Sequence, residues 1–457
     1  MKLIYDVKDR PAFRAVLAFS FQQLLAIMAA TIAVPAIIGH GMTASAALFG
    51  AGIGTLVYQV FTKFRSPVFL GSSFAFLGSM ASAFAGASSM SLGFFGLILG
   101  AFFAGLVYVG IAIIVRISGT DWINRIMPAV VIGPTVAIIG LSLAGNAVGD
   151  MKTADAGGSL YVAMICALVT LFVVIICSVF GKKSARLIPF IIGILAGYAV
   201  ALIFTLIGTV SGAEALKIID FSPFKSLTEN GLSLTTFLNV PQFTFIKAAS
   251  GIHEADAAYI GSIAVAYIPV AFVVFAEHIA DHKNLSSIIE HDLLKDPGLS
   301  RTLLGDGIGS FAGAIFGGCP NTTYGESIGC VAITKNASII SISGAAIFCI
   351  VLSFVAPVVA FLDSIPACVM GGVCMTLYGF IAVSGLKMLQ PVDLNDNRNL
   401  FIASVILISG VGGLSISFGH VTITTVACSL ILGIITSTIV SRKKKDITDD
   451  EPQQIIK

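Results

Sequence analysis

Two acidic residues and two histidines directly follow the uncharged run Tyr259–Ala276. On a helix, residues four positions apart share a face, so Glu277 and Asp281 are predicted to lie together. His278 and His282 share a second face, rotated from the first by about 100°. Ionisable side chains inside a membrane span are rare and mark functional sites, so the acidic face is a candidate for ligand binding or proton transfer. The alternative is a helix end that emerges into the cytoplasm, where such residues are ordinary.

A third carboxyl group, that of Glu326, lies in a break between two apolar runs, the stretch Cys319–Gly329. Lipid supplies no water for backbone N–H and C=O groups, so broken backbone at membrane depth is tolerated only where protein or a cavity surrounds it. The next residues, Ser327–Thr334, are predicted to form a half-helix whose free N–H groups carry partial positive charge. If Glu277 and Glu326 face one cavity, they favour holding at least one proton between them. That is the chemistry of a proton-coupled carrier.

A metal site and an enzyme active site are the competing interpretations of this cluster. Two histidines four positions apart can bind a metal, but the His-Glu-X-X-His pattern is absent and no third ligand is evident. No Ser-His-Asp constellation, glycine-rich phosphate loop or nucleophile elbow is identifiable either. We therefore predict no enzymatic activity, no metal and no cofactor, with protons as the coupling ion.

The composition indicates that these groups are positioned by a membrane protein. Of the 457 residues, 56% are hydrophobic and only 11% are charged, whereas about 25% are charged in a soluble domain. Apolar runs of about 20 residues, long enough to cross a bilayer, recur along the chain. We predict an all-α polytopic protein of the lipid bilayer with fourteen transmembrane elements, the third and tenth being too short or too polar for ordinary spans. Their predicted starts lie near residues 14, 43, 68, 92, 127, 159, 186, 258, 302, 322, 338, 363, 399 and 420.

The basic residues predict the orientation of the chain. With the N-terminus inside, all but four of the 26 Lys and Arg residues fall in or beside inner segments, as the positive-inside rule requires. An odd number of spans would place the run Arg442–Lys445 outside, so an even number with both termini cytoplasmic is predicted. The start Met1–Arg14 leads into the first span without a cleavable signal peptide. The basic residues form no single patch, so no nucleic-acid partner is expected. The four outer residues are Lys152, Lys217, Lys225 and Lys247.

The chain divides into two halves around a polar middle segment. Seven elements on each side would invert the second half relative to the first, as in many secondary transporters. The third element, Pro67–Phe76, and the tenth, Pro320–Gly329, are both interrupted, and such corresponding breaks indicate a mid-membrane binding site. Two ordinary Gly/Ser-rich packing helices are the alternative. The predicted units are a first inverted repeat at 1–210, a connecting segment at 211–257, a second inverted repeat at 258–441 and a cytoplasmic tail at 442–457.

Four motifs resemble the uracil permeases of the nucleobase–ascorbate transporter family, and the likeness runs over nearly the whole chain. The family's purine and ascorbate carriers have a Gln/Asn-Asn-Gly pattern at the tenth element, where this chain has Asn-Thr-Thr-Tyr-Gly-Glu. The resemblance therefore favours uracil over xanthine or urate. The motifs are Leu70–Phe76, Ala276–His278, Asp292–Leu299 and Pro320–Glu326.

The resemblance implies a multi-pass carrier of the bacterial inner membrane that imports uracil with protons by alternating access. It implies a core domain (elements 1–4 and 8–11) and a gate domain (elements 5–7 and 12–14), with a short antiparallel strand from each of the third and tenth elements. It is also compatible with a homodimer. The implied uracil contacts are the carboxyl groups of Glu277 and Glu326, the backbone at Phe74 and Gly325, and the pocket-lining residues Ala30, Tyr324 and Tyr378.

One position departs from the family pattern. Some relatives have a histidine four residues after the first site glutamate, where it bonds that carboxyl and takes part in proton coupling, and this chain has Asp281 there. Either Asp281 faces Glu277 and competes with it for a proton, or His282 turns inward and takes the histidine's role. The implied proton-coupling residues are thus Glu277, Asp281, His282 and Glu326. A carrier for another nucleobase or for an anion is the nearest alternative function, followed by a passive channel and an intramembrane enzyme.

Overall fold

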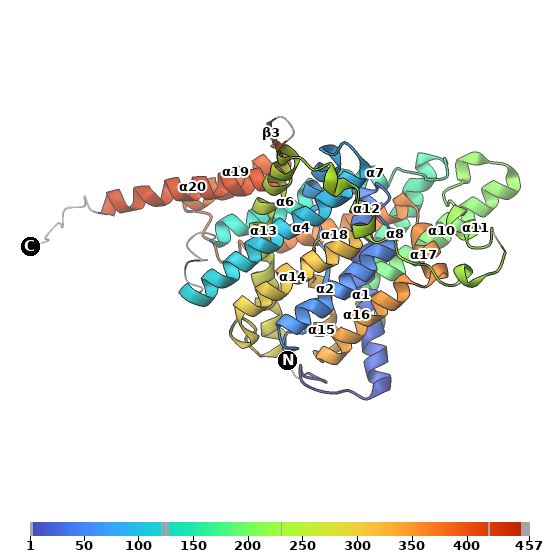
Figure 1. Ribbon diagram of the computed structural model, residues 1–457, viewed down its shortest axis with the longest axis horizontal. Coiled ribbons are helices and arrows are strands. Elements are labelled where there is room, and N and C mark those ends of the chain that lie inside the picture. Colours follow the sequence, from blue (N-terminus) through green and yellow to red (C-terminus); the bar gives the residue numbers. More distant parts are fainter. Residues whose placement is uncertain (1–2, 120–121, 123–127, 230, 419–420, 449–457) are drawn as a thin grey trace, which may run out of the picture.

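The computed structural model of the protein describes residues 3–119, 122, 128–229, 231–418 and 421–448. It is a bundle of apolar helices with two small strand pairs (Figure 1). Among the described residues, eight helical spans are long and apolar enough to cross a membrane. These spans are α1 (Phe13–Ile38), α2 (Ala44–Phe61), α4 (Met90–Ser118), α6 (Ala129–Ser142) continued by α7 (Ala144–Asp150), α8 (Leu160–Phe180), α10 (Pro189–Ser211), α13 (Ala257–Ile289) and α18 (Ala367–Lys387).

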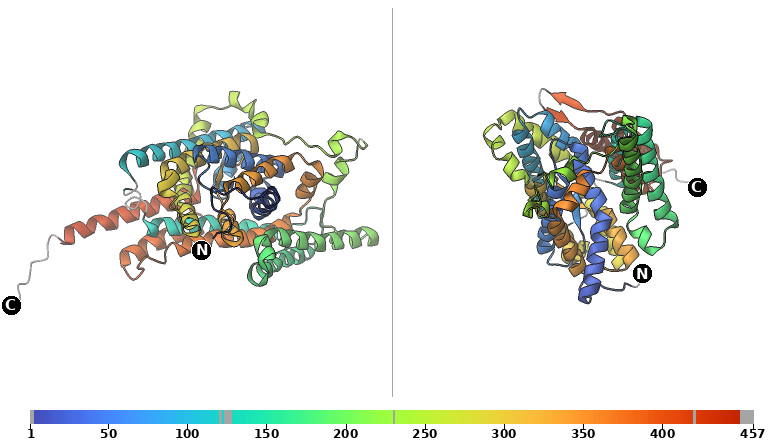
Figure 2. Two further views of the ribbon diagram at one scale, coloured as in Figure 1. Left: turned by 90° about the horizontal axis from the view of Figure 1, so that it is seen from below. Right: turned by 90° about the vertical axis from the view of Figure 1, so that its right-hand side faces the viewer.

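Shorter helices complete the bundle. Three of them, α16 (Ile339–Ser353), α19 (Asn397–Val411) and the first part of α20 (Thr425–Thr448), are apolar. The predicted helical, multi-pass character is therefore confirmed, while the count of fourteen elements stays a prediction. In both views of Figure 2, the green helices α8 and α10 stand side by side at one edge of the molecule.

Two short strands that are far apart in the sequence pair with one another. Strands β1 (Leu70–Ser72) and β2 (Asn321–Thr323) are antiparallel, with Leu70 opposite Thr323. Pro320 directly precedes β2, and its fixed φ is compatible with an extended segment. The strand pair predicted for the third and tenth elements is thereby confirmed.

Each strand of this pair leads into a half-helix. Helix α3 (Leu77–Ala85) follows β1 and has 9 residues, and α15 (Gly325–Thr334) follows β2 and has 10. Both are far shorter than the roughly 20 residues that cross a bilayer. Helix α15 begins two residues earlier than predicted, at Gly325, so Glu326 lies in its first turn.

Glycines let the strand pair sit close to two helices. Along α14 (Leu299–Gly317), glycines recur every fourth residue and face α2. A Cβ at Gly309 would meet the α2 backbone, and a Cβ at Gly313 would overlap the side chain of Asn321. The Asn321 amide occupies that space and donates to the carbonyl oxygen of Gly50 at 3.1 Å. Small residues thus allow close helix packing and also anchor β2.

The remaining elements are short. Strands β3 (Ile416–Phe418) and β4 (Val421–Ile423) form an antiparallel hairpin that the hydrophobic pattern did not predict. Helix α20 continues through 442–448, into the predicted cytoplasmic tail, and 449–457 of that tail lie outside the described residues. The others are α9 (Lys183–Leu187), η1 (Glu214–Leu216), α11 (Ser222–Ser226), η2 (Leu234–Thr236), α12 (Thr244–Ala248), η3 (Gly251–His253), η4 (Leu294–Gly298) and α17 (Ala356–Asp363).

Candidate functional site

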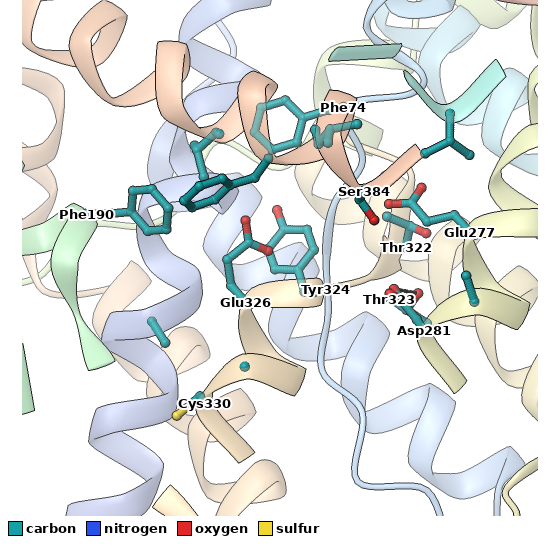
Figure 3. Close-up of a pocket in the computed structure, with 18 of the residues that line it drawn as sticks. Phe74, Phe190, Glu277, Asp281, Thr322, Thr323, Tyr324, Glu326, Cys330 and Ser384 are labelled. Atoms are coloured by element: carbon teal, nitrogen blue, oxygen red, sulfur yellow. Dashed lines mark hydrogen bonds between the residues drawn. The ribbon is translucent and has the colours of Figure 1, made fainter. Parts of the chain in front are cut away.

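A cavity of about 360 Å³ lies against the starts of both half-helices (Figure 3). Its wall includes Phe74 and Ala75, which precede α3, and Tyr324, Gly325 and Glu326 at the start of α15. Its volume lies within the range of small-molecule sites, about 300–1,000 Å³. The two interrupted elements therefore open onto one shared space.

The acidic face of α13 borders the same cavity. Glu277 and Asp281, one helical turn apart, both line the wall, and Glu326 lines it from α15 (Figure 3). All three residues remain partly exposed because they face this open space. The structure therefore brings together the two glutamates that the sequence predicts to share a pocket. Both belong to the second predicted repeat, whereas Phe74 comes from the first.

Two residues predicted to line the pocket are not part of its wall. Ala30 is buried within α1, and Ala26, one turn earlier, forms the wall instead. Tyr378 of α18 packs against Phe74, with 5.7 Å between ring centroids and 78° between ring planes. The structure thus places Tyr378 beside a lining residue and Ala30 further along a lining helix.

Helix N-termini add partial positive charge to the cavity. The first N–H groups of a helix have no intrahelical carbonyl partner, and that end carries roughly half a positive charge. Helix α15 begins at the cavity wall, and α3 begins two residues after the wall residue Ala75, so backbone donors approach the same space as the carboxyl groups. Broken helices in transporters point such ends at polar ligands. The cavity can therefore offer hydrogen-bond donors and acceptors together.

Side chains fix the strand pair that supports these helix starts. The Leu70 N–H donates to Thr55 Oγ1 at 2.9 Å, and the Thr55 hydroxyl donates to the Leu70 carbonyl at 3.0 Å. The hydroxyl of Tyr324 donates across the pair to the carbonyl oxygen of Ser72 at 2.8 Å. A Cβ at Gly71 would overlap the Tyr324 ring, so only glycine fits beneath it. The backbone next to the cavity is thus held in place before a ligand arrives.

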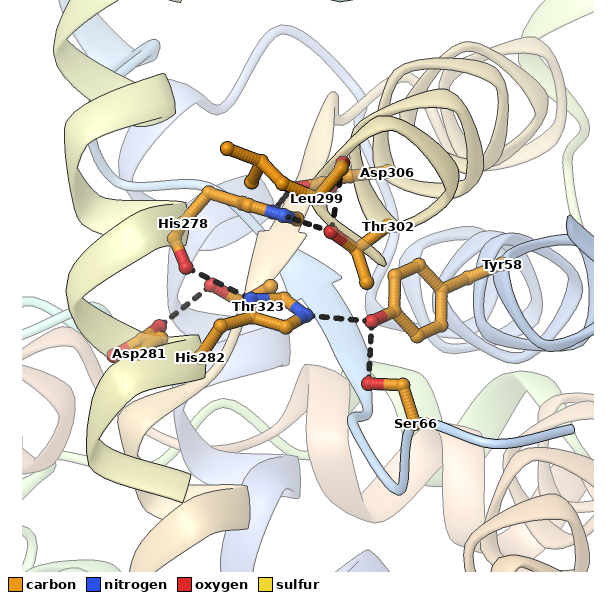
Figure 4. Close-up of polar contacts among 9 residues, drawn as sticks. All are labelled: Tyr58, Ser66, His278, Asp281, His282, Leu299, Thr302, Asp306 and Thr323. Atoms are coloured by element: carbon orange, nitrogen blue, oxygen red, sulfur yellow. Dashed lines mark hydrogen bonds and ion pairs between the residues drawn. The ribbon is translucent and has the colours of Figure 1, made fainter. Parts of the chain in front are cut away.

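On the other face of α13, His278 is directed into the helix bundle (Figure 4). Its Nδ1 atom lies 2.6 Å from Oδ2 of Asp306, and its Nε2 atom lies 3.0 Å from Oγ1 of Thr302. Both partners belong to α14. His278 is fully buried and the Asp306 side chain is 1% exposed. This histidine therefore joins two helices and does not reach the cavity.

His282 lies on the same buried face. Its Nδ1 atom bonds the carbonyl oxygen of His278 at 2.8 Å, and its Nε2 atom bonds the hydroxyl of Tyr58 at 2.7 Å (Figure 4). The two imidazole rings stack with 4.0 Å between centroids. Of Asp281 and His282, which the sequence left as alternatives, the structure therefore places Asp281, and not His282, at the cavity.

Sequence reasoning missed several polar residues of this region. Thr322, Thr323 and Ser384 line the cavity, and Asp306 lies buried behind α13. The two threonines lie in the predicted break, and Asp306 is a single carboxylate in a glycine-rich apolar run, which is itself a signal. Ser384 is one of many hydroxyl residues and carries no such signal. Within the part of the chain that the structure describes, no group of three or more His, Cys, Asp or Glu could hold a metal ion.

Solved structures of membrane transporters share this fold. The murine Solute Carrier 26 family member A9 anion transporter in the inward-facing state matches with a TM-score of 0.65 and 11% identity, over 96% of this chain and 69% of that chain. The transmembrane domain of the cyanobacterium bicarbonate transporter BicA matches with a TM-score of 0.59 and 15% identity, over 94% of this chain and 100% of that chain. The fold is therefore that of a multi-pass membrane transporter.

Sequence relatives define the family more closely. A model of the Permease family (Xan_ur_permease) matches residues 14–420. The chain is 37% identical to the uracil permease of Bacillus subtilis (strain 168), over 100% of this chain and 99% of that protein. It is 34% identical to the uracil permease of Escherichia coli (strain K12), over 98% of both. The chain therefore belongs to the Permease family, whose named members are transporters and not enzymes, as the sequence predicted.

Proposed function

We propose that the protein imports uracil together with protons across a bacterial cell membrane by alternating access. The observation that carries this proposal is the shared cavity, whose wall holds Glu277 of α13 and Glu326 in the first turn of α15. The named function of the relatives, uracil permease, supports uracil as the ligand.

The chemistry of uracil matches these groups. The ring alternates N–H donors with carbonyl acceptors. Carboxyl groups accept hydrogen bonds from N–H groups, and backbone N–H groups donate to carbonyl oxygens. We assign the donors of uracil to Glu277 and Glu326, and its acceptors to backbone N–H groups at Phe74 and Gly325. Tyr324 then acts by holding this backbone, through its bond to Ser72.

Crowding of like charges in the cavity supports the proposed proton coupling. The cavity wall holds three carboxyl residues, Glu277, Asp281 and Glu326, and one cationic residue, Arg186. Carboxylates that share a small site disfavour each other's charged form, so at least one proton is held among them. Uracil is neutral and does not compensate this charge. We therefore propose that these three acids carry the coupling proton.

A second cavity supports alternating access. It has about 300 Å³ and shares Phe74, Ala75 and Ile139 with the first. Its wall includes His40 and Asn146, whereas the first cavity reaches Arg186, on the side predicted to be cytoplasmic. We propose that the shared residues separate an inward-open site from an outer vestibule. Movement of the core domain (elements 1–4 and 8–11) against the gate domain (elements 5–7 and 12–14) would exchange the two.

The site argues against an anion as the substrate, although transporters of similar fold carry anions by name. The helix starts favour negative charge, but three carboxyl residues line the same space and would repel an anion. A neutral, flat, polar ligand satisfies both sets of groups. Placement in a bacterial inner membrane with both termini cytoplasmic, and assembly as a homodimer, remain parts of this proposal.

The test is uptake of labelled uracil by vesicles that contain the purified protein. With the outside more acidic than the inside, wild-type vesicles should accumulate uracil above its equilibrium level, and a protonophore should abolish the accumulation. Excess uracil should compete, whereas xanthine, urate and bicarbonate should compete weakly. Accumulation that resists the protonophore, or that an anion blocks better than uracil does, would contradict the proposal.

A further inference from the structure

One hydrogen bond connects the acidic face of α13 with the strand pair. Thr323 is the last residue of β2, and its hydroxyl donates to Oδ2 of Asp281 at 2.6 Å (Figure 4). Both residues line the cavity, and Thr323 is only 1% exposed. The bond therefore joins a proposed proton-carrying residue to the strand that leads into α15.

The chain on either side of Thr323 is tightly constrained. Its partner across the strand pair is Leu70, whose backbone N–H and C=O are both held by Thr55. The next residues, Tyr324 and Gly325, form the cavity wall and the start of α15. Thr323 therefore lies two residues before Gly325, whose backbone N–H we assign as a donor to a carbonyl oxygen of uracil. A change in the bond of the Thr323 hydroxyl acts close to that contact.

The protonation state of Asp281 determines which hydrogen bonds the Thr323 hydroxyl can make. A hydroxyl has one hydrogen to donate, and an ionised carboxylate can only accept. Once Asp281 takes up a proton, the carboxyl gains a donor of its own, and the bond from Thr323 loses its charge assistance. The side chain of Thr323 is then free to rotate or to accept from the carboxyl group.

Other titratable groups surround Asp281. Glu277 lies one turn earlier on α13, Glu326 lies on α15, and Arg186 lies in the same cavity wall. On the buried face of α13, His278 bonds Asp306 of α14, and this hydrogen bond is sealed from the cavity. The acids across the cavity oppose charge on Asp281, and Thr323 supplies a hydrogen bond that favours it.

We propose that Thr323 is a positioning residue that couples the protonation of Asp281 to the geometry of the β2–α15 junction, and thereby to uracil binding. This inference rests on the proposed proton-coupled transport. It adds to that proposal a role for Thr323, which lies in the motif Pro320–Glu326 but to which neither the motif nor the relatives' names assign a role.

Thr322 provides a matched control. It has the same side chain, lies on the same strand and lines the same cavity, but its buried hydroxyl has no hydrogen-bond partner among the residues that the structure describes. Valine in place of either threonine keeps the shape and removes the hydroxyl. The two substitutions therefore differ in whether they break the bond to Asp281.

The experiment measures the initial rate of uracil uptake by vesicles against pH for wild type, Thr323→Val, Thr323→Ser and Thr322→Val. Without the donor, the carboxylate form of Asp281 loses a bond that stabilises it, so the alkaline limb of the profile should move to higher pH. About one pH unit is expected from the loss of one hydrogen bond to a charged group. Thr323→Ser and Thr322→Val should keep the midpoint of the wild-type profile.

The outcomes separate this inference from the proposed function. If wild-type vesicles show no proton-dependent uracil uptake, the proposed function fails and the inference fails with it. If wild type transports as proposed and Thr323→Val keeps the wild-type midpoint, only the inference is overturned. An equal shift in Thr322→Val would also overturn it. In an Asp281→Asn background, Thr323→Val should cause no shift, and a full shift there would contradict the assignment.

A second substitution at Thr323 tests the inference if Thr323→Val does not fold. If Thr323→Val fails to elute as a single species in detergent, Thr323→Cys replaces it, because a thiol is a much weaker donor than a hydroxyl. The same upward shift supports the inference, and an unchanged midpoint in this variant overturns it.

Discussion

The two faces of α13 carry ionisable residues in very different surroundings. On the cavity face, Glu277 and Asp281 are partly exposed to a space large enough for a ligand. On the second face, which faces the helix bundle, His278 and His282 are fully buried, and all four ring nitrogens have hydrogen-bond partners. Buried polar groups with every partner present hold a structure together, whereas partly exposed acids can bind ligands and protons. The cavity face of α13 can thus take part in transport, whereas its buried face supports the structure.

The positions of the protons on the buried face follow from counting hydrogen-bond donors and acceptors. The Thr302 hydroxyl donates to the Leu299 carbonyl at 3.0 Å, so toward His278 it can only accept, and Nε2 of His278 carries a hydrogen. One further proton is then shared between Nδ1 of His278 and Asp306. The carbonyl of His278 likewise requires a hydrogen on Nδ1 of His282. Because the two rings stack, charge on both at once is disfavoured.

The largest effect should come from breaking the buried pair. Asp306→Ala leaves His278 without its partner in a sealed site, which should lower the free energy of unfolding by about 3–5 kcal/mol. Asp306→Asn can still donate to Nδ1 and should cost far less. Thermal unfolding in detergent measures both variants. If Asp306→Ala unfolds like the wild type, the buried face does not have the structural role assigned to it.

Substitutions on the cavity face should reduce transport and leave stability nearly unchanged. Glu277→Gln and Glu326→Gln should each reduce uracil uptake by about 100-fold, since an amide replaces the proposed charged acceptor of a uracil N–H, at about 1.4 kcal/mol per tenfold. The melting temperature should change little. The control is Glu229→Gln, which changes an exposed loop residue. Uptake at wild-type rates in either site variant would refute its assignment.

A smaller effect tests whether the buried face takes part in proton transfer. Tyr58→Phe removes the hydroxyl that bonds Nε2 of His282 and should cost about 1–2 kcal/mol of stability. The pH profile of uptake should keep its midpoint, because neither residue reaches the cavity. A shifted midpoint would show that His282 exchanges protons during transport, and the distinction between the faces would be lost.

The smallest effect concerns an exposed pair used as a reference. Arg65 Nη1 lies 2.8 Å from Asp296 Oδ1, with both side chains more than 40% exposed, and this hydrogen bond lowers the pKa of Asp296. Such a pair stabilises by less than about 1 kcal/mol. Its contribution is present above the usual Asp pKa of about 3.9 and is lost as pH falls through the lowered folded value. Arg65→Ala should thus be less stable than wild type at pH 7, and the difference should shrink as pH falls through the lowered pKa of Asp296. A cost above 2 kcal/mol at pH 7 would contradict this.

Sequence patterns predicted the faces of α13 but not their surroundings. Helical spacing alone separates Glu277 and Asp281 from the two histidines. Whether a given face meets a cavity or another helix depends on packing, so the pattern left Asp281 and His282 as open alternatives. Asp306 supplies the partner of His278 from α14, and no local pattern connects residues on different helices.

The strand pair shows the same limit. The two breaks could be located from Pro320 and the loss of apolar residues, but the resemblance, and not the pattern, implied that they pair. The β3–β4 hairpin was missed because its β-branched residues are as apolar as those of a helix. Ala30 and Tyr378 were carried over by motif position alone, and depth behind a cavity wall cannot be read from position in a motif.

The most direct test of the account measures proton entry with a pH-sensitive dye inside vesicles when uracil is added. Wild type should acidify the interior, Asp281→Asn should not, and His282→Gln should still do so. Acidification that survives Asp281→Asn but disappears in His282→Gln would place the coupling proton on the buried face and contradict the account.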